Sequence, residues 1–343
     1  MTDLWTYLKD AKKPVFLYGT GNGADKITDE LIKNGITVTG VYASDGFVRD
    51  RYFRGYKVMS FSDVCRQYGD IISLVSFGTQ IPEVMENIKK ISDVCETYAP
   101  DVPVIADGEI FNAEYAKKHK SELEYAYSLL ADSQSKKVFE NIVKYKLTGK
   151  LDYLFDAETD KSEAYGLLGL KSAENYMDLG AYNGDTVKEF LNIVHTYGKI
   201  IAVEPDKKNF KKLTNTAGEL ANTALYNAAV SDRDGKIEFT MRSGRNSVIG
   251  NGTVIDVYTV DTLASGDNIT YIKMDIEGEE INAVHGAQKT LKRCKPKLNI
   301  AAYHKNADIF AIPILLKSIV PDYKIYLRHH PYIPAWDTNY YVK

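Results

Sequence analysis

Residues 176–185 combine glycines with acidic and amide side chains in a pattern suited to binding a nucleotide-type ligand. An apolar strand pattern leads into the stretch, glycines at 180 and 184 punctuate a turn, and Asp185 opens a helix whose apolar residues recur at helical spacing. Glycines let a ligand approach the backbone, and the free amides of a helix N-terminus point toward it. The sequence therefore predicts a cofactor loop here.

Acidic residues follow two later strand patterns. Glu204 comes about twenty residues after the glycine loop, which is the spacing of a carboxylate that accepts both hydrogen bonds from a ribose diol. Asp275 and Glu277 close another strand and could act as a general base or hold a divalent ion through oxygen ligands. A metal site would need a third ligand, and no tight cluster such as H-x-H supplies one, so a divalent metal is possible but not favoured.

These residues must be positioned by an alternation of strands and helices. Near the N-terminus we predict a helix over 1–12, strands over 14–18, 36–42, 71–77 and 102–106, and helices over 25–34 and 82–98. From residue 173 onward we predict strands over 176–179, 200–204, 224–230, 237–241, 254–259, 270–275, 297–303, 323–328 and 339–342. Residues 109–172 show helical spacing without a strand pattern. We expect two Rossmann-like α/β domains, 1–108 and 173–343, joined by a helical connector over 109–172.

A second glycine turn lies near the N-terminus. Gly19, Gly21 and Ala24 fit the dinucleotide pattern G-x-G-x-x-G/A, Gly23 lies in the same turn, and Asp45 stands about where a ribose-binding acid is expected. The same glycines are needed simply to let a helix pack closely on a strand. Both interpretations, a nucleotide site and a packing turn, stay open.

The order of these segments resembles the class I S-adenosylmethionine-dependent methyltransferases, and within them the FkbM family. The resemblance covers about residues 165–343, and the stretch 272–280 (Ile-Lys-Met-Asp-Ile-Glu-Gly-Glu-Glu) is its most specific part. The other matching stretches are 178–186, 203–205, 227–232, 259–263 and 286–287. One departure is Ala301-Ala302, where many family members carry a carboxylate, so a metal or substrate role for that strand end is not carried over.

The resemblance implies a seven-stranded sheet with an antiparallel last strand, S-adenosylmethionine over the glycine loop, and methyl transfer above the strand ends. It implies that Glu204 holds the ribose, that residues from Asn227 to Asp232 lie beside the adenine, and that Asp275 faces the methyl group. The cofactor-binding candidates are Asp178, Gly180, Tyr182, Gly184, Asp185, Glu204, Asn227, Asp232 and Asp275.

Methyl transfer to a hydroxyl needs a group that removes the hydroxyl proton. His304, at the end of a predicted strand, is the first candidate, with Asp275 and Glu277 as further catalytic candidates. Arg328 and His329 close the next strand and could hold an anionic acceptor. The polar loop around Ser247 is either a substrate contact or a simple edge insertion.

The favoured function is an O-methyltransferase acting on a glycan or other small sugar-containing acceptor, the acceptor class coming from the resemblance alone. A nucleotide or nucleotide-sugar enzyme using the Gly19 turn and a non-catalytic cofactor-binding scaffold are the alternatives. A net charge of −3 with mixed signs argues against a nucleic-acid partner, and no signal peptide or membrane-span pattern is visible, so we expect a cytoplasmic protein. The sequence does not indicate an oligomeric state.

Overall fold

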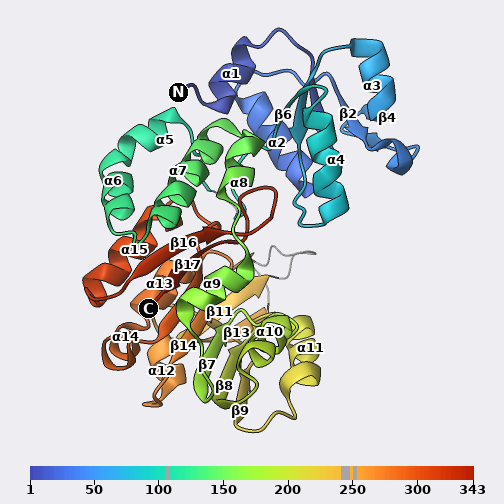
Figure 1. The fold of residues 1–343 in the computed structure, drawn as a ribbon. Coiled ribbons are helices and arrows are strands. Elements are labelled where there is room, and N and C mark those ends of the chain that lie inside the picture. The colour runs from blue at the N-terminus through green and yellow to red at the C-terminus, as the bar shows by residue number, and fades with distance from the viewer. Residues whose placement is uncertain (106–107, 241–247, 250–252) are drawn as a thin grey trace.

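The chain forms two large sheets with a group of helices between them (Figure 1). This description comes from a computed structural model and covers residues 1–105, 108–240, 248–249 and 253–343. None of the helices in these ranges has the length and apolar character that crossing a bilayer requires.

The N-terminal sheet has six strands in the order β3-β4-β2-β1-β5-β6, and all but β3 run parallel. Its central strands are buried throughout because helices cover both faces. The strands are β1 (Val15–Tyr18), β2 (Gly40–Ala43), β3 (Tyr52–Phe53), β4 (Tyr56–Ser60), β5 (Ile72–Val75) and β6 (Glu96–Tyr98), and the main helices are α1 (Leu4–Asp10), α2 (Asn22–Lys33), α3 (Phe61–Tyr68) and α4 (Pro82–Ser92).

One predicted strand of this sheet is wrong. The described residues of 102–106 are irregular, and the edge strand is instead β6, inside the stretch predicted as the end of a helix. Pro103 has no amide hydrogen to give to a sheet, whereas Glu96 pairs with Ile72 of β5. Only this pairing with a distant strand selects the extended conformation for so short a segment.

The connector is helical, as the lack of strand spacing predicts. Its helices are α5 (Ala113–Lys118), α6 (Lys120–Ser128), α7 (Ser133–Thr148), α8 (Leu151–Ala157) and α9 (Lys161–Leu168). Helix α7 packs on strand β16 (Ile325–His329) of the C-terminal sheet, and α6 packs on helix α15 (Asp308–Ile319), so these helices cover part of that sheet.

The C-terminal sheet has seven strands in the order β16-β17-β15-β14-β7-β8-β9. Strands β7, β8, β9, β14 and β15 run parallel, and β17 is antiparallel to both of its neighbours, which confirms the predicted seven-stranded sheet with an antiparallel last strand. The strands are β7 (Glu174–Leu179), β8 (Tyr197–Val203), β9 (Thr223–Tyr226), β14 (Tyr271–Met274), β15 (Lys297–Ala301), β16 (Ile325–His329) and β17 (Thr338–Val342). The helices packed around it are α10 (Asp185–Val194), α11 (Lys207–Ala217), α12 (Val260–Ala264), α13 (Glu280–His285), α14 (Gln288–Cys294) and α15 (Asp308–Ile319).

The segment predicted as one strand over 224–230 is divided between two sheets. Asn227 separates β9 from β10 (Ala228–Val230), and β10 pairs with β13 (Thr253–Tyr258) of a small four-stranded sheet that also contains β11 (Gly235–Thr240) and β12 (Val248–Ile249). The Asn227 amide donates to the carbonyl oxygens of Glu204 and Pro205, so the chain turns at this residue.

Candidate active site

The glycine loop and the acidic strand ends meet at one edge of the C-terminal sheet. Leu179 at the end of β7 is in register with Met274 of β14 on one side and with Val203 of β8 on the other. The residues that follow these three strands, Gly180, Asp275 and Glu204, therefore lie side by side. The carboxyl edge of parallel strands is where open α/β sheets bind their ligands.

Gly180 is fixed by close backbone packing. Its φ is +79°, and an added Cβ would lie 1.9 Å from the carbonyl oxygen of Asp275. No other residue type fits this position without displacing the loop after β14. The glycine thus joins the cofactor loop to the strand end that carries Asp275.

Asp178 lies beneath the same loop and is fully buried. Its Oδ2 accepts a hydrogen bond of 2.5 Å from the Thr186 hydroxyl, and its Oδ1 lies 3.6 Å from Lys273 Nζ, which donates to the Gly180 carbonyl. Burial raises the pKa of the Asp178 carboxyl, and the Lys273 charge opposes this shift. Oδ1 is buried and has no hydrogen-bond partner in the described part of the chain, and the Lys273 ammonium is the charge beside it.

Glu204 holds two loops together through its carboxylate. Oε2 accepts from the backbone amide of Tyr182 at 2.9 Å and Oε1 from that of Asp206 at 2.8 Å. The residue is only 6% exposed, and burial raises the pKa of its carboxyl to about 7 although both amides oppose the shift. Each carboxylate oxygen has two lone pairs, so each can still accept one further hydrogen bond from a ligand.

The remaining cofactor candidates differ in their distance from this loop. Tyr182 is 43% exposed, Gly184 precedes α10 with φ +85°, and Asp185 begins that helix. Asn227 uses its amide on the backbone of residues 204 and 205. Asp232 lies at the surface after β10, beside Thr259 and Asp261 and not at the glycine loop. The roles of these residues toward a cofactor remain predictions.

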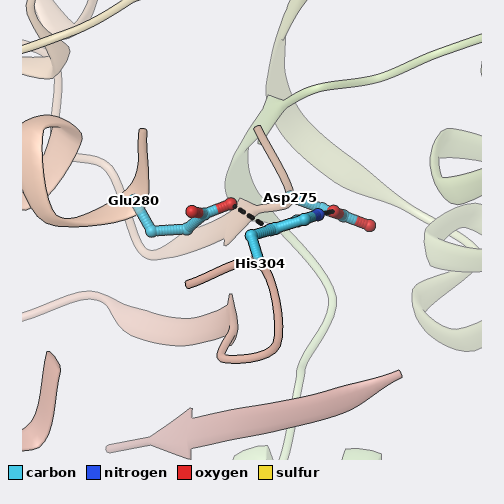
Figure 2. Close-up of side chains that lie close together, drawn as sticks. All are labelled: Asp275, Glu280 and His304. Carbon is cyan, nitrogen blue, oxygen red and sulfur yellow. Dashed lines mark ion pairs between the residues drawn. The ribbon is translucent and has the colours of Figure 1, made fainter. Parts of the chain in front are cut away.

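His304 lies between carboxylates from two directions (Figure 2). Its Nδ1 is 2.9 Å from Glu280 Oε1, and its Nε2 is 3.5 Å from Asp275 Oδ1 and 3.6 Å from Glu277 Oε2. The imidazole and Glu280 are almost completely buried, while the other two carboxylates are partly open to solvent. Tyr303 donates its hydroxyl to the same Asp275 oxygen at 3.0 Å.

This arrangement argues against His304 as the general base. Burial lowers the pKa of the imidazole, but the negative charges of Glu280, Asp275 and Glu277 outweigh it and raise the pKa to about 10. With this pKa the imidazole is already protonated at neutral pH and has no lone pair for a hydroxyl proton. The exposed carboxylates of Asp275 and Glu277 are the better candidates.

The predicted substrate residues Arg328 and His329 do not face an open site. Arg328 is 2% exposed and is bound by Asp132 and Glu163 of the connector and by Ser135. His329 is fully buried with Nδ1 on Thr338, and burial lowers the pKa of its ring to about 3. Both side chains are packed in the interior because the connector covers the end of β16. Ser247 lies outside the described residues.

Two glycines of the N-terminal turn are closely packed, whereas an added Cβ on Gly21 would meet no atom within 4 Å. A Cβ on Gly23 would lie 2.3 Å from the Ser76 carbonyl oxygen, and one on Gly19, whose φ is +109°, would lie 2.7 Å from the Phe77 ring. Gly21 precedes α2. Asp45 accepts hydrogen bonds from the amide and hydroxyl of Ser62, one on each carboxylate oxygen. The role of this turn toward a nucleotide stays a prediction.

A small cavity opens beside Asp275, between the sheet and helices α9 and α10. Its volume of about 90 Å³ is well below the ~300–1,000 Å³ of typical ligand pockets, so it can admit a few waters or one edge of a ligand. Its polar lining includes Lys161, Glu189, Asp337 and Asn339, and its apolar lining combines tyrosines with Leu170, Phe190 and Met274.

Comparison with known proteins agrees with this geometry. Residues 178–322, which contain the glycine loop, Glu204, Asp275 and His304, match the model of the methyltransferase FkbM domain. The chain contains a methyltransferase FkbM domain. The protein is therefore a methyltransferase, as the resemblance in its sequence implies.

Solved structures show the extent of the fold likeness. Methyltransferase FkbM from Methylobacillus flagellatus KT is 21% identical, with 96% of this chain and 90% of that chain covered and a TM-score of 0.74. A precorrin-6y C5,15-methyltransferase from Geobacter metallireducens GS-15 is 11% identical and covers 53% of this chain and 85% of its own, with a TM-score of 0.35. No curated protein matches the sequence.

The FkbM domain also contains residues that the sequence analysis did not select. Glu280 lies within the matching stretch 272–280, and its Oε1 is 2.9 Å from His304 Nδ1. Lys273 lies in the same stretch and is buried beside Asp178. One feature of the sequence could have pointed to both residues. Each is a charged residue within or close to an apolar strand pattern, and a charge buried there needs a partner.

Proposed function

We propose that the protein transfers a methyl group from S-adenosylmethionine to a hydroxyl of a sugar, glycan or sugar-containing metabolite. The observation that carries this proposal is the Glu204 carboxylate, buried beside the glycine loop and held in place by two backbone amides. It retains acceptor capacity for a ribose diol at the strand end where the family resemblance expects one.

The other residues of the loop fit the amino-acid part of the same cofactor. The buried Oδ1 of Asp178 and the closely packed Gly180 line the region under the loop, and α10 presents its N-terminus there. When bound, S-adenosylmethionine supplies an electrophilic methyl group on a sulfonium. The chain's part is alignment of the two reactants and exclusion of water.

Asp275 and Glu277 are placed to receive the acceptor's proton. They follow β14 directly, next to Gly180, and their side chains are 38% and 40% exposed. The acceptor O–H bond breaks as its oxygen bonds to the methyl carbon and the carbon–sulfur bond breaks, with the proton going to one of these carboxylates. General-base assistance of this kind contributes typically ~10²–10⁴-fold.

The cavity beside Asp275 supports a polar acceptor. Its Lys161, Glu189, Asp337 and Asn339 side chains offer donors and acceptors that suit hydroxyl groups. The sugar class itself comes from the family resemblance.

Calorimetric titration with S-adenosylmethionine tests the proposal. We expect wild-type protein to bind and Glu204→Gln to bind at least tenfold more weakly. Glu174→Gln is the matched control, since Glu174 is a buried acid at the opposite end of β7, held by Lys297 and the Lys171 amide. Absence of binding by wild type, or equal binding by Glu204→Gln, would contradict the proposal. Formation of S-adenosylhomocysteine with a panel of sugars then tests the acceptor class.

A further inference from the structure

We propose that the N-terminal sheet shapes the cavity beside Asp275 by holding the loop 330–337, which joins β16 to β17. Asp337 of this loop lines the cavity together with Lys161 and Asn339. The part that this plays in catalysis rests on the proposed function, which assigns the cavity to the acceptor, whereas the hold on the loop does not. Residues beside the N-terminal sheet thereby act as positioning residues for methyl transfer.

The segment that follows β5 contacts this loop through both backbone and side chain. The Thr79 amide donates to the Ile333 carbonyl oxygen at 2.8 Å, and the Ile333 amide donates to the Thr79 carbonyl oxygen at 2.9 Å. Next to this pair, the ring of Trp336 lies against Gly78, where an added Cβ would be 2.4 Å from the nearest ring atom. Two consecutive residues of the segment therefore fix the loop.

The same segment is fixed in turn to the centre of the N-terminal sheet. Both the amide and the hydroxyl of Ser76 donate to the Tyr18 carbonyl oxygen, at 3.0 and 2.8 Å. The N-terminal glycine turn packs on it so closely that a Cβ on Gly23 would lie 2.3 Å from the Ser76 carbonyl oxygen. The glycine turn, the segment 76–79 and the loop 330–337 thus form one continuous series of contacts.

Asp337 follows Trp336 directly and extends these contacts into the cavity. Its φ is +62°, a conformation that is rare for a residue other than glycine and that persists only where the surroundings fix it. Its carboxylate lies 3.1 Å from Lys161 Nζ and accepts from the Asn339 side-chain amide at 2.7 Å. A displacement of the loop would therefore move the polar groups of the cavity wall.

Small movements of this loop should matter for the reaction. A misplacement of about 1 Å in a positioning group can cost about 10²-fold in rate. The cavity volume of about 90 Å³ leaves little room for an acceptor group to find another position. Neither Gly78 nor Trp336 lines the cavity, so both act through Asp337.

Acetylation of Lys161 in the full-length protein tests the hold on the loop, with mass spectrometry as the readout. Only the uncharged amine reacts with a reagent such as acetic anhydride. Burial lowers the pKa of the Lys161 ammonium, but the charge of Asp337 outweighs it and raises the pKa. In Gly78→Ala the added Cβ displaces Trp336, so we expect Lys161 to react several-fold faster, at a rate that approaches that in Asp337→Asn.

Gly40→Ala is the matched control. Its Cβ would lie 2.7 Å from the Phe16 ring, within the N-terminal sheet, so we expect Lys161 to react as in wild type. Gly78→Val is a second variant, and its larger side chain should increase the rate further. Thermal unfolding verifies that each variant is folded. A wild-type rate in both Gly78 variants would overturn the proposal.

The Michaelis constants give the second readout. With methyl glycosides of common hexoses as acceptors, we expect Gly78→Ala to raise the KM of the sugar about tenfold, while the KM of S-adenosylmethionine stays at its wild-type value. Equal sugar KM values in Gly78→Ala and Gly40→Ala would also overturn the proposal. Binding of S-adenosylmethionine without methylation of any sugar would reject the sugar acceptor of the proposed function, and the Lys161 rates would then decide by themselves whether the loop is held in this way.

Discussion

His304 Nδ1 lies 2.9 Å from Glu280 Oε1, and both side chains are almost fully removed from solvent. Neutralising Glu280 leaves the buried imidazolium with only the more distant carboxylates of Asp275 and Glu277. We expect Glu280→Gln to lower the free energy of unfolding of the protein by about 3–5 kcal/mol at pH 7. Urea denaturation measures this, and a loss below 1 kcal/mol would show that the pair contributes little.

The same pair gives a dependence on alkaline pH. The pKa of His304 is raised from its ordinary value near 6.5 to about 10, so its stabilising contribution is complete below pH 6.5 and is lost as the pH rises through 10. In Glu280→Gln the pKa of His304 should move downward. Proton NMR titration of the imidazole checks this, and an unchanged titration would contradict the contact.

Replacement of Gly180 should damage both stability and cofactor binding. In Gly180→Ala the new Cβ meets the Asp275 carbonyl oxygen, and the positive φ adds strain. Gly35→Ala is a matched control, since Gly35 has φ +70° with no atom within 4 Å of the added Cβ. We expect about 1 kcal/mol of destabilisation for Gly35→Ala and at least twice that for Gly180→Ala, measured by urea unfolding. Equal losses of stability in the two variants would mean that the loop at Gly180 moves to make room for the added Cβ.

Glu204 should make stability fall as the pH rises from about 4.5 to 7. The pKa of its buried carboxyl is raised to about 7, so the folded state holds the proton more tightly than the unfolded chain and loses stability as the proton leaves. The full effect is on the order of 3 kcal/mol. Glu204→Gln should flatten this part of the pH profile of unfolding. A profile identical to wild type would show that another group causes the slope.

Arg328 should matter for stability and not for a ligand. Its side chain is 2% exposed, although Asp132 and Glu163 are 30% and 54% exposed. We expect Arg328→Gln to cost about 1.5–3 kcal/mol, because it removes charge-assisted hydrogen bonds made by a buried guanidinium. Arg54→Gln is the control, since Arg54 pairs with Asp25 and Asp29 at the surface, where such pairs contribute about 1 kcal/mol or less. Calorimetry should show unchanged S-adenosylmethionine affinity in folded Arg328→Gln. Equal stability losses in the two variants would contradict the buried role.

The sequence predicted the sheet and the convergence of its strand ends. Gly180, Glu204 and Asp275 each follow an apolar strand pattern. Parallel strands bring their carboxyl ends to one edge of a sheet, so the strand pattern and this rule were sufficient to predict that the three residues meet. The separate strand at 96–98 could not be predicted in the same way. Its three residues continue a helical pattern, and only pairing with β5 makes them extended.

By itself, then, the sequence determined the fold class and the loop that a cofactor would occupy, because repeated apolar spacing and glycine turns are local properties. Only the tertiary structure decided which charged residues are buried and which of them hold a proton. Arg328 meets Asp132 from 196 positions away and becomes part of the interior, while His304 meets Glu280 and gains a tightly held proton. The protonation and accessibility of a charged side chain depend on what packs around it, and those neighbours come from distant parts of the chain.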